Sequence, residues 1–272
     1  MTHRVTATII LMTAMLMDLM DSTITNVALP AISTDLGATP TQLEWTLVGY
    51  VVAFATLLIT GGRLGDIYGR KRIFLVGVIG FTCASMLASL AWNGNALITA
   101  RIIQGAFAGV MVPQVLSSVQ VMYTPEERGP VFGVIGSLNA LGVITGLLLG
   151  GWLVTANLFG TGWRSIFLIN VPVGIVLTVM AFLCIPESRS EHPLRLDLTG
   201  SALGATAVVL LVLPLTEGRA AGWAWWIWAL LIAAPFAIIT FIWQQHRRAT
   251  GVPSIDPMAI GSRVSPAAKE VK

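Results

Sequence analysis

The sequence predicts an all-α integral membrane protein with about eight transmembrane helices. The first observation is composition: the 272 residues are 55% apolar and only 11% charged, with a mean hydropathy of +0.81. The second is that the apolar residues gather in runs long enough to cross a bilayer. Soluble domains are roughly 45–50% apolar and about 25% charged, so a soluble globular domain is excluded. The same composition excludes a disordered chain.

A helix needs about 20 largely apolar residues to span the hydrocarbon core. Runs of that length lie at approximately 7–30, 43–62, 73–92, 96–122, 131–154, 164–185, 199–216 and 224–243. The first run follows Arg4, as a secretory signal would. It continues to Pro30 without an Ala-x-Ala site, so we expect it to stay in the mature protein. Prolines within later runs predict kinks at Pro113, Pro172, Pro214 and Pro235.

The basic residues predict the orientation. With a cytoplasmic N terminus, most of the 16 Lys and Arg residues fall on the inner side, as the positive-inside rule requires. Both termini are then cytoplasmic, and the net charge of +3 reflects topology rather than a nucleic-acid partner. Several tryptophans fall near the outer boundary, where indole rings commonly anchor: Trp163, Trp223, Trp225, Trp226 and Trp228. A tryptophan stripe lining a ligand pocket is the alternative.

The link Pro186–Asp197 is long, polar and proline-bearing, and it predicts a domain boundary. We expect a six-helix bundle over residues 1–185 and a linker helix pair over 186–243. The polar residues 244–272 are expected to form a cytoplasmic tail.

Two acids in the first run, Asp18 and Asp21, lie three residues apart and project from the same side of a helix. At a lipid-facing helix centre each would cost roughly 2.5–3.5 kcal/mol. We therefore expect both to face a bundle interior or a watery cavity, where desolvation favours reversible protonation. A proton-coupled carrier needs such a group. The alternative is a structural contact, with Asp21 accepting from the nearby Thr23, Thr25 or Asn26.

The opposite charge comes from Arg101, a few residues into the fourth run, with Gln104 three positions on. A buried guanidinium has to be paired or hydrated, and it favours the ionised form of a neighbouring acid. Competition between a proton and Arg101 for one acid would act as a switch. The alternative is that Arg101 reaches the interface from its place near the end of the run.

Two glycine patterns indicate close helix contacts and a tight turn. The segment between the second and third runs sets glycines, an acid and bases at a fixed spacing that topology alone does not require: Gly62, Asp66, Gly69, Arg70 and Lys71. In the fifth run, glycines at every fourth position form a flat strip for another helix: Gly142, Gly146 and Gly150.

These motifs, in this order, resemble those of the major facilitator superfamily, specifically its fourteen-span drug:proton antiporters. LMDSTITNVALP, from Leu19 to Pro30, resembles the first-helix motif, whose acid corresponds to Asp21. GRLGDIYGRKR matches the loop after the second span, RIIQG the fourth-span motif with its arginine at Arg101, and GWRSIFLINVPVG the sixth-span segment. The last two runs resemble the helix pair that links the two six-helix halves. The fold that this implies is a major-facilitator-type helical bundle.

Two departures from the family pattern stand out. The fifth-span antiporter motif normally ends in Gly-Pro-x-x-Gly-Gly, whereas Leu147 follows Gly146 here. The pattern also implies six further spans, so the chain resembles only the N-terminal half plus the linker helices, truncated relative to the family. We expect such a lone bundle to leave Asp21, Arg101 and the glycine strip facing lipid or solvent, and Asp66 without its partner. A second copy or a separate C-terminal half would restore these contacts.

The resemblance implies a membrane transporter of the multidrug efflux class. It would export small hydrophobic or cationic compounds in exchange for protons across the plasma membrane, as antibiotic-resistance proteins do. Asp21 would be the protonatable residue, Asp18 a supplementary acid, and Arg101 with Gln104 the coupling pair. The rival hypotheses are a truncated non-transporting half or assembly subunit, and a metabolite exporter of the same superfamily. The 3 histidines are far apart and no Gly-x-Ser-x-Gly or Walker loop occurs, so we expect no enzyme, metal or cofactor.

Overall fold

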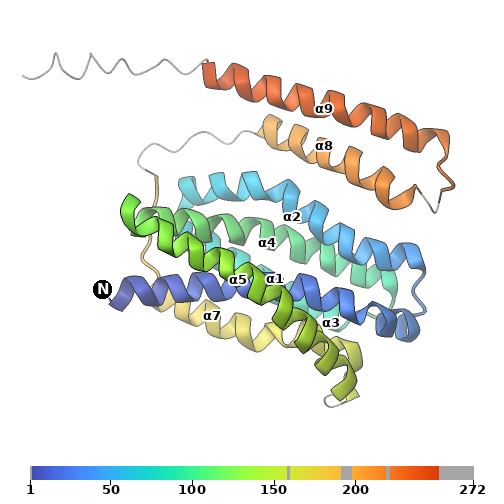
Figure 1. Cartoon of the computed structure of the whole chain (residues 1–272), viewed down its shortest axis with the longest axis horizontal. Coiled ribbons are helices and arrows are strands. Elements are labelled where there is room, and N and C mark those ends of the chain that lie inside the picture. The colour runs from blue at the N-terminus through green and yellow to red at the C-terminus, as the bar shows by residue number, and fades with distance from the viewer. Residues whose placement is uncertain (1, 158–159, 191–197, 219–220, 251–272) are drawn as a thin grey trace, which may run out of the picture.

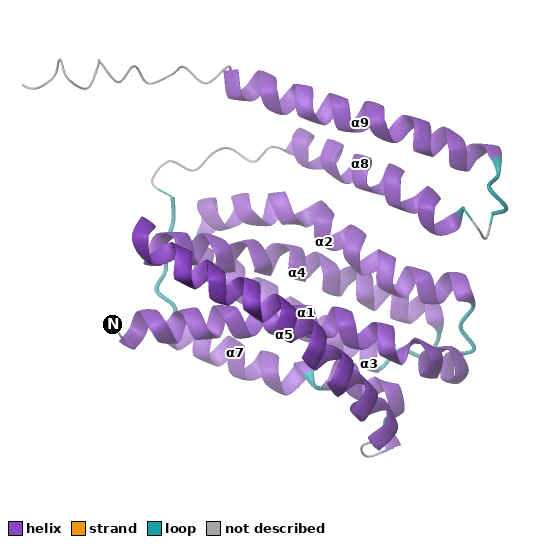
Figure 2. Ribbon diagram, in the orientation of Figure 1, coloured by secondary structure: helices purple, strands orange, loops and turns teal. Residues whose placement is uncertain are grey.

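The computed structural model describes residues 2–157, 160–190, 198–218 and 221–250. Regular structure in these ranges is helical, without strands (Figure 2). The elements are α1 (Thr2–Leu36), α2 (Pro40–Tyr68), α3 (Arg70–Ser89), α4 (Gly94–Met122), α5 (Pro125–Ala156), the 3-10 turn η2 (Gly162–Arg164), α6 (Ser165–Leu168), α7 (Asn170–Cys184), α8 (Leu198–Glu217) and α9 (Trp225–Thr250).

Within the described residues, 8 helical segments are long and apolar enough to cross a membrane. This confirms the predicted fold class of an all-α membrane protein. The sixth segment is built from η2, α6 and α7 rather than from one helix. Pro172 has no N–H to bond the carbonyl of Leu168, the residue at which α6 ends. The other three prolines expected to kink helices lie inside α4, α8 and α9.

The end of α9 differs from the expectation for the tail. The helix continues to Thr250, past the start at residue 244 that the polar composition suggested. Residues 251–272, the rest of the expected cytoplasmic tail, lie outside the described residues.

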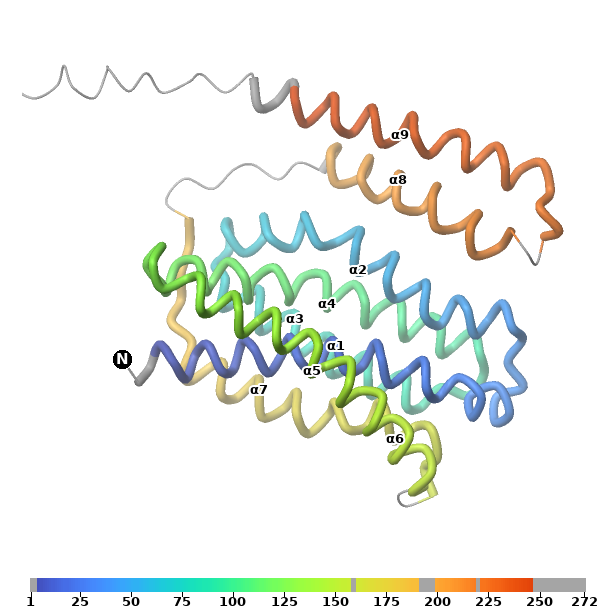
Figure 3. The backbone as a smooth tube through the Cα atoms, viewed as in Figure 1, coloured from blue at the N-terminus to red at the C-terminus, as the bar shows by residue number. Residues whose placement is uncertain are grey.

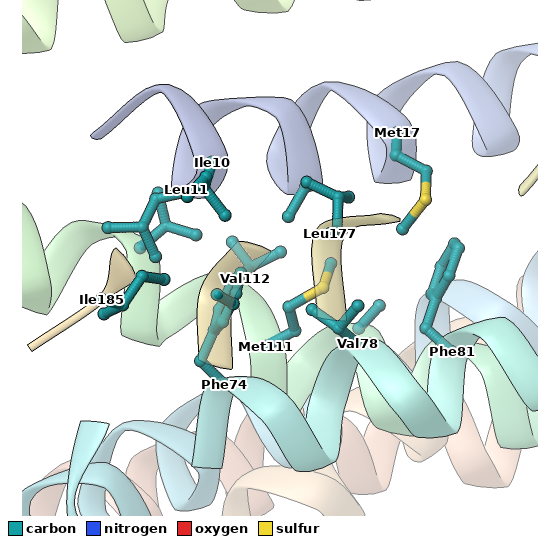
Figure 4. Packing of buried hydrophobic residues seen from close by; sticks show 14 of the residues in the cluster. Ile10, Leu11, Met17, Phe74, Val78, Phe81, Met111, Val112, Leu177 and Ile185 are labelled. Carbon is teal, nitrogen blue, oxygen red and sulfur yellow. The ribbon is translucent and has the colours of Figure 1, made fainter. Parts of the chain in front are cut away.

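Two hydrophobic clusters, at different levels of the bundle, hold the helices together. Figure 4 shows the first, in which side chains of α1 such as Leu11 and Met17 pack with side chains of α3, α4 and α7 such as Phe81. The second cluster includes Ile24 of α1 and Leu97 of α4. Buried polar residues of α1 and α4 therefore lie between two apolar layers, in the part of the bundle where an uncompensated charge would cost most.

The glycines of α4 bring that helix into backbone contact with α2. A Cβ on Gly105 would collide with the carbonyl of Tyr50, and one on Gly109 with the carbonyl of Phe54. These contacts fix the position of Tyr50 along the helix axis relative to the residues of α4.

The glycine strip of α5 faces α1. A Cβ on Gly142 would lie 3.0 Å from Cβ of Leu19, and one on Gly146 would lie 2.8 Å from Cβ of Thr23. All three glycines of the strip are buried. The expectation that a lone bundle leaves this strip facing lipid is therefore wrong, because α1 covers it.

We predict that Gly146→Ala lowers the free energy of unfolding by about 1–3 kcal/mol, because the new methyl group must push Thr23 and the carbonyl of Met20 away. The matched control is Gly151→Ala on the same helix, where a Cβ meets nothing within 4 Å. The control should be neutral or stabilising by up to about 1 kcal/mol. Equilibrium unfolding in mixed detergent micelles measures both, and equal effects would contradict the packing.

The helix pair α8 and α9 forms a hairpin beside the bundle. Figure 1 shows α8 lying along α2, with α9 on the far side of α8. The indole N–H of Trp45 on α2 donates a hydrogen bond to the carboxylate of Glu217 at the end of α8. Because hydrophobic packing gives little preference between helices and lipid, such a polar contact helps to fix where the hairpin docks.

The two ends of the bundle carry different charged contacts. Figure 3 places the N terminus at the same end as the turn between α2 and α3 and the start of α5. At this end Arg4 pairs with Glu127 at 2.7 Å, and Lys71 donates to the carbonyl of Phe182 at 2.7 Å. At the opposite end Arg164 pairs with Asp35 at 2.6 Å.

The tryptophans divide into two groups. Trp225 and Trp228 of α9 are exposed, as interfacial anchors would be. Trp163 is only 2% exposed and donates from its indole N–H to Asp35 at 2.9 Å. The expectation that Trp163 anchors at the interface is wrong, because its ring packs into the second hydrophobic cluster, edge to face with Phe167.

Candidate functional site

The centre of the bundle contains a buried ion pair between Asp21 of α1 and Arg101 of α4. Each side chain is 1% exposed. The guanidinium also donates from Nη1 to Oε1 of Gln104 at 2.7 Å and from Nε to the carbonyl of Thr46 at 3.3 Å. Arg101 therefore does not reach the interface, and the expectation that Asp21 and Arg101 face lipid or solvent is wrong. Helices α3, α4 and α7 enclose the pair.

Two amides complete the shell around Asp21. Nε2 of Gln104 donates to Oδ1 of Asp21 at 2.9 Å, and Nδ2 of Asn170 donates to the same oxygen at 2.6 Å. Both amides also donate to the hydroxyl oxygen of Ser85, at 2.7 Å and 3.1 Å. Side chains from α1, α3, α4 and α7 thus form one network in which the carboxylate accepts from several donors.

A second acid lies beside this network. Asp18 is 7% exposed and accepts a hydrogen bond from the hydroxyl of Tyr50 on α2. The ring of Tyr50 stacks under Arg101, whose guanidinium carbon lies 4.2 Å from the ring centroid. On the side of α6, the ring of Phe167 lies 5.7 Å from the same carbon. Such cation–π contacts stabilise a charge that has been removed from water.

The structure brings together the four residues predicted for proton coupling: Asp18, Asp21, Arg101 and Gln104. The alternative partners of Asp21 do not bind its carboxylate. Thr25 donates to the backbone carbonyl of Asp21, and Asn26 donates to that of Ser22. Sequence reasoning missed Tyr50, Ser85 and Asn170. The one available signal was Asn170, a lone amide inside the apolar segment SIFLINVPVG.

The motif between α2 and α3 forms a tight turn. Gly69 adopts a φ of +107°, which few other residues tolerate, and connects the two helices. Asp66 pairs with Arg70 at 2.7 Å, so it does not lack a partner within this chain. The backbone N–H of Lys71 donates to Glu187 beyond α7 at 3.2 Å. A Cβ on Gly62 would lie 3.7 Å from Cβ of Pro113 on α4, an ordinary van der Waals contact.

In the part of the chain that the structure describes, a helical bundle with 8 candidate spans and an ion pair in its interior defines a multi-pass membrane protein. The family model described as "Major Facilitator Superfamily" matches residues 11–243. The chain belongs to this superfamily, whose members are transporters rather than enzymes.

The curated relatives include resistance and export proteins. The chain is 44% identical to the "Probable actinorhodin transporter" of Streptomyces coelicolor over 239 residues, covering 88% of this chain and 41% of that protein. It is 34% identical to the "Puromycin resistance protein pur8" of Streptomyces alboniger, covering 94% of this chain and 50% of that one. The chain therefore spans about half the length of the curated relatives it matches.

Solved structures agree on the fold. A bacterial homologue of the human drug peptide transporters PepT1 and PepT2 matches with a TM-score of 0.64 at 15% identity, covering 91% of this chain and 57% of that one. A bacterial homologue of the human lysosomal transporter Spinster matches with a TM-score of 0.60 at 19% identity, covering 86% and 60%.

Proposed function

We propose that this chain takes part in proton-coupled export of small hydrophobic or cationic compounds. The observation that carries the proposal is the buried network of Asp18, Asp21, Arg101 and Gln104, since acids inside a bilayer are costly and are kept where they bind ions or protons. The names of the relatives support the substrate class. They include a puromycin resistance protein, a tetracenomycin C resistance and export protein and a methylenomycin A resistance protein.

The network has the parts that coupling requires. A proton entering down a membrane potential of about 100 mV supplies about 2.3 kcal/mol. Neutralising an acid in the network changes the balance of charge around Arg101, which contacts α1 through Asp21 and α2 through Thr46 and Tyr50. A change at one acid can therefore alter how α1, α2 and α4 pack, and so bias the opening of the bundle to one side.

We propose that the protein lies in the plasma membrane with both termini in the cytoplasm. Basic residues gather at the end of the bundle that holds the N terminus, where Arg4, Arg70, Lys71 and Arg72 make their contacts. This asymmetry is the one that the positive-inside rule associates with the cytoplasmic side. Helix α9 ends at Thr250, at the same end of the bundle as the start of α1 (Figure 1).

We further propose that residues 1–185 form the transporter bundle and residues 186–243 a linker pair. In this arrangement a second copy of the chain or a separate C-terminal half completes the translocation path. The docking of α8 on α2 through Trp45 and Glu217 supports a linker that packs beside the bundle.

Dye efflux tests the proposal. Cells that produce this chain should hold less ethidium, a hydrophobic cation, than cells that produce the double variant Asp18→Asn/Asp21→Asn at matched membrane levels. A protonophore should abolish the difference. Equal accumulation in the two strains would overturn export by this chain.

A further inference from the structure

The two acids of the network have unequal surroundings. We infer that Asp18 carries the exchangeable proton, while Asp21 stays ionised as the fixed counter-ion of Arg101. This inference rests on the proposed function, and it reverses the roles that the family resemblance implies for the two acids.

The carboxylate of Asp21 is saturated with donors. It accepts from the guanidinium of Arg101, from Gln104 at 2.9 Å and from Asn170 at 2.6 Å. All three partners present N–H groups, and the guanidinium cannot give up its charge in a protein. Protonating Asp21 would set an O–H against these donors and would leave Arg101 as an unpaired buried cation. Both consequences oppose proton binding.

The carboxylate of Asp18 has one polar partner within the described residues, the hydroxyl of Tyr50, which donates to Oδ1. Its second oxygen carries no hydrogen bond from the described chain. The side chain keeps 7% of its surface exposed, against 1% for Asp21. A proton can therefore add to the free oxygen while the bond from Tyr50 is retained.

The charged and titratable groups that face Asp18 come from three helices. Tyr50 on α2 is in direct contact, Arg101 on α4 lies across the ring of Tyr50, and Asp21 follows one turn later on α1. The parts of α5 and α7 that pack against α1 carry no titratable side chain between residues 129 and 156 or between 165 and 183. No further cation of the described chain pairs with Asp18.

The charge balance of the network points the same way. It contains two carboxylates and one guanidinium, and Asp21 takes the guanidinium. An ionised Asp18 is then the excess negative charge, and one proton makes the network neutral without breaking a hydrogen bond. The step is the binding of one proton to one carboxylate oxygen, and no other bond changes. Tyr50 connects the change to Arg101, because the same ring contacts both side chains.

Infrared spectroscopy of the full chain in lipid nanodiscs tests this assignment. Acidification should produce the carbonyl band of a buried protonated carboxylic acid in the unmodified chain. Asp18→Asn should remove this band. Asp21→Asn should retain it but move its appearance to lower pH, because Asp18 then becomes the counter-ion of Arg101. Tyr50→Phe should retain the band but shift its position, because the carbonyl oxygen of the acid loses its donor. A purely structural role for Tyr50 would leave the band unshifted.

The outcomes separate the two proposals. Loss of the band in Asp21→Asn and its retention in Asp18→Asn would overturn the assignment but leave proton-coupled export standing. If neither variant changes the band, both the assignment and the proton coupling fail. If the band follows Asp18 but the chain exports no dye, the proton site stands and the export proposal fails. Asp18→Asn still offers an oxygen to Tyr50 and should fold. Asp18→Asn and Tyr50→Phe therefore test whether Asp18 carries the proton even where Asp21→Asn does not fold.

Discussion

Replacing Asp21 by leucine is expected to lower the free energy of unfolding by about 3–5 kcal/mol, because the change leaves the guanidinium of Arg101 buried without its counter-ion. Arg101 is 1% exposed, so water cannot replace the lost carboxylate unless the bundle opens. Gln104 and the carbonyl of Thr46 still accept from the guanidinium, but neither supplies a negative charge.

The double variant Asp21→Leu/Arg101→Met is expected to recover most of that loss. Removing both charges removes the desolvation cost together with the attraction. Gln104 and Asn170 keep the hydroxyl of Ser85 as a shared partner of their amide nitrogens, and the amide oxygen of Gln104 alone loses its donor. The coupling energy between the two positions should therefore be large and favourable in a double-mutant cycle.

Equilibrium unfolding in mixed micelles measures the four chains of this cycle. Arg164→Met is the matched control, since it breaks the ion pair between Arg164 and Asp35. The side chain of Arg164 is 31% exposed and that of Asp35 is 48% exposed. Exposed pairs contribute at most about 1 kcal/mol, so the control should lose little. If the free-energy costs of the two single changes simply add in the double variant, the result would contradict a favourable interaction between Asp21 and Arg101.

The sequence was sufficient to predict the spans and the polar residues inside them. Composition and run length determine that a helix enters the bilayer, and a carboxyl such as Asp21 in such a helix must avoid lipid. Neither argument depends on how the helices are arranged. For this reason the fold class could be predicted from 272 residues without any structure.

The partners of the polar residues could not be predicted in the same way. Asn170 lies 149 positions from Asp21 along the chain, and Tyr50 lies 32 positions from Asp18. Helical periodicity shows which residues share a face, but it does not show which other helix that face meets. The expectation that Asp21 is left exposed failed for this reason, because α3, α4 and α7 close around it within this chain.

Replacing Gln104 by methionine is expected to lower the free energy of unfolding by about 3 kcal/mol, because hydrogen bonds to charged groups contribute about 1.5–3 kcal/mol each. Gln104 uses all of its polar atoms in the network. Its amide nitrogen donates to Asp21 at 2.9 Å and to Ser85 at 2.7 Å, and its oxygen accepts from Arg101 at 2.7 Å. Methionine has a similar length and volume, so the change removes the polar contacts without creating a large cavity.

Gln114 on the same helix provides a control with the same substitution. Both glutamines are fully buried, but the amide nitrogen of Gln114 donates only to backbone carbonyls, those of Gly61 at 2.7 Å and Val110 at 3.0 Å. Its buried oxygen has no hydrogen-bond partner in the described part of the chain. Gln114→Met removes that unpaired oxygen. The carbonyls of Gly61 and Val110 each keep the backbone hydrogen bond within their own helix. The change should therefore alter stability by no more than about 1 kcal/mol.

Thermal unfolding of the two variants, compared at equal detergent and lipid content, separates the effect of the network from that of a buried amide in general. A large loss for Gln104→Met beside a small one for Gln114→Met would mean that the stability of α4 in the bundle depends on the charges it meets. Equal losses would mean that burial of a glutamine alone determines the loss of stability. The network around Asp21 would then add nothing to the stability of the bundle. The structure supports the first result, because Gln104 contacts both members of the ion pair and Gln114 contacts neither.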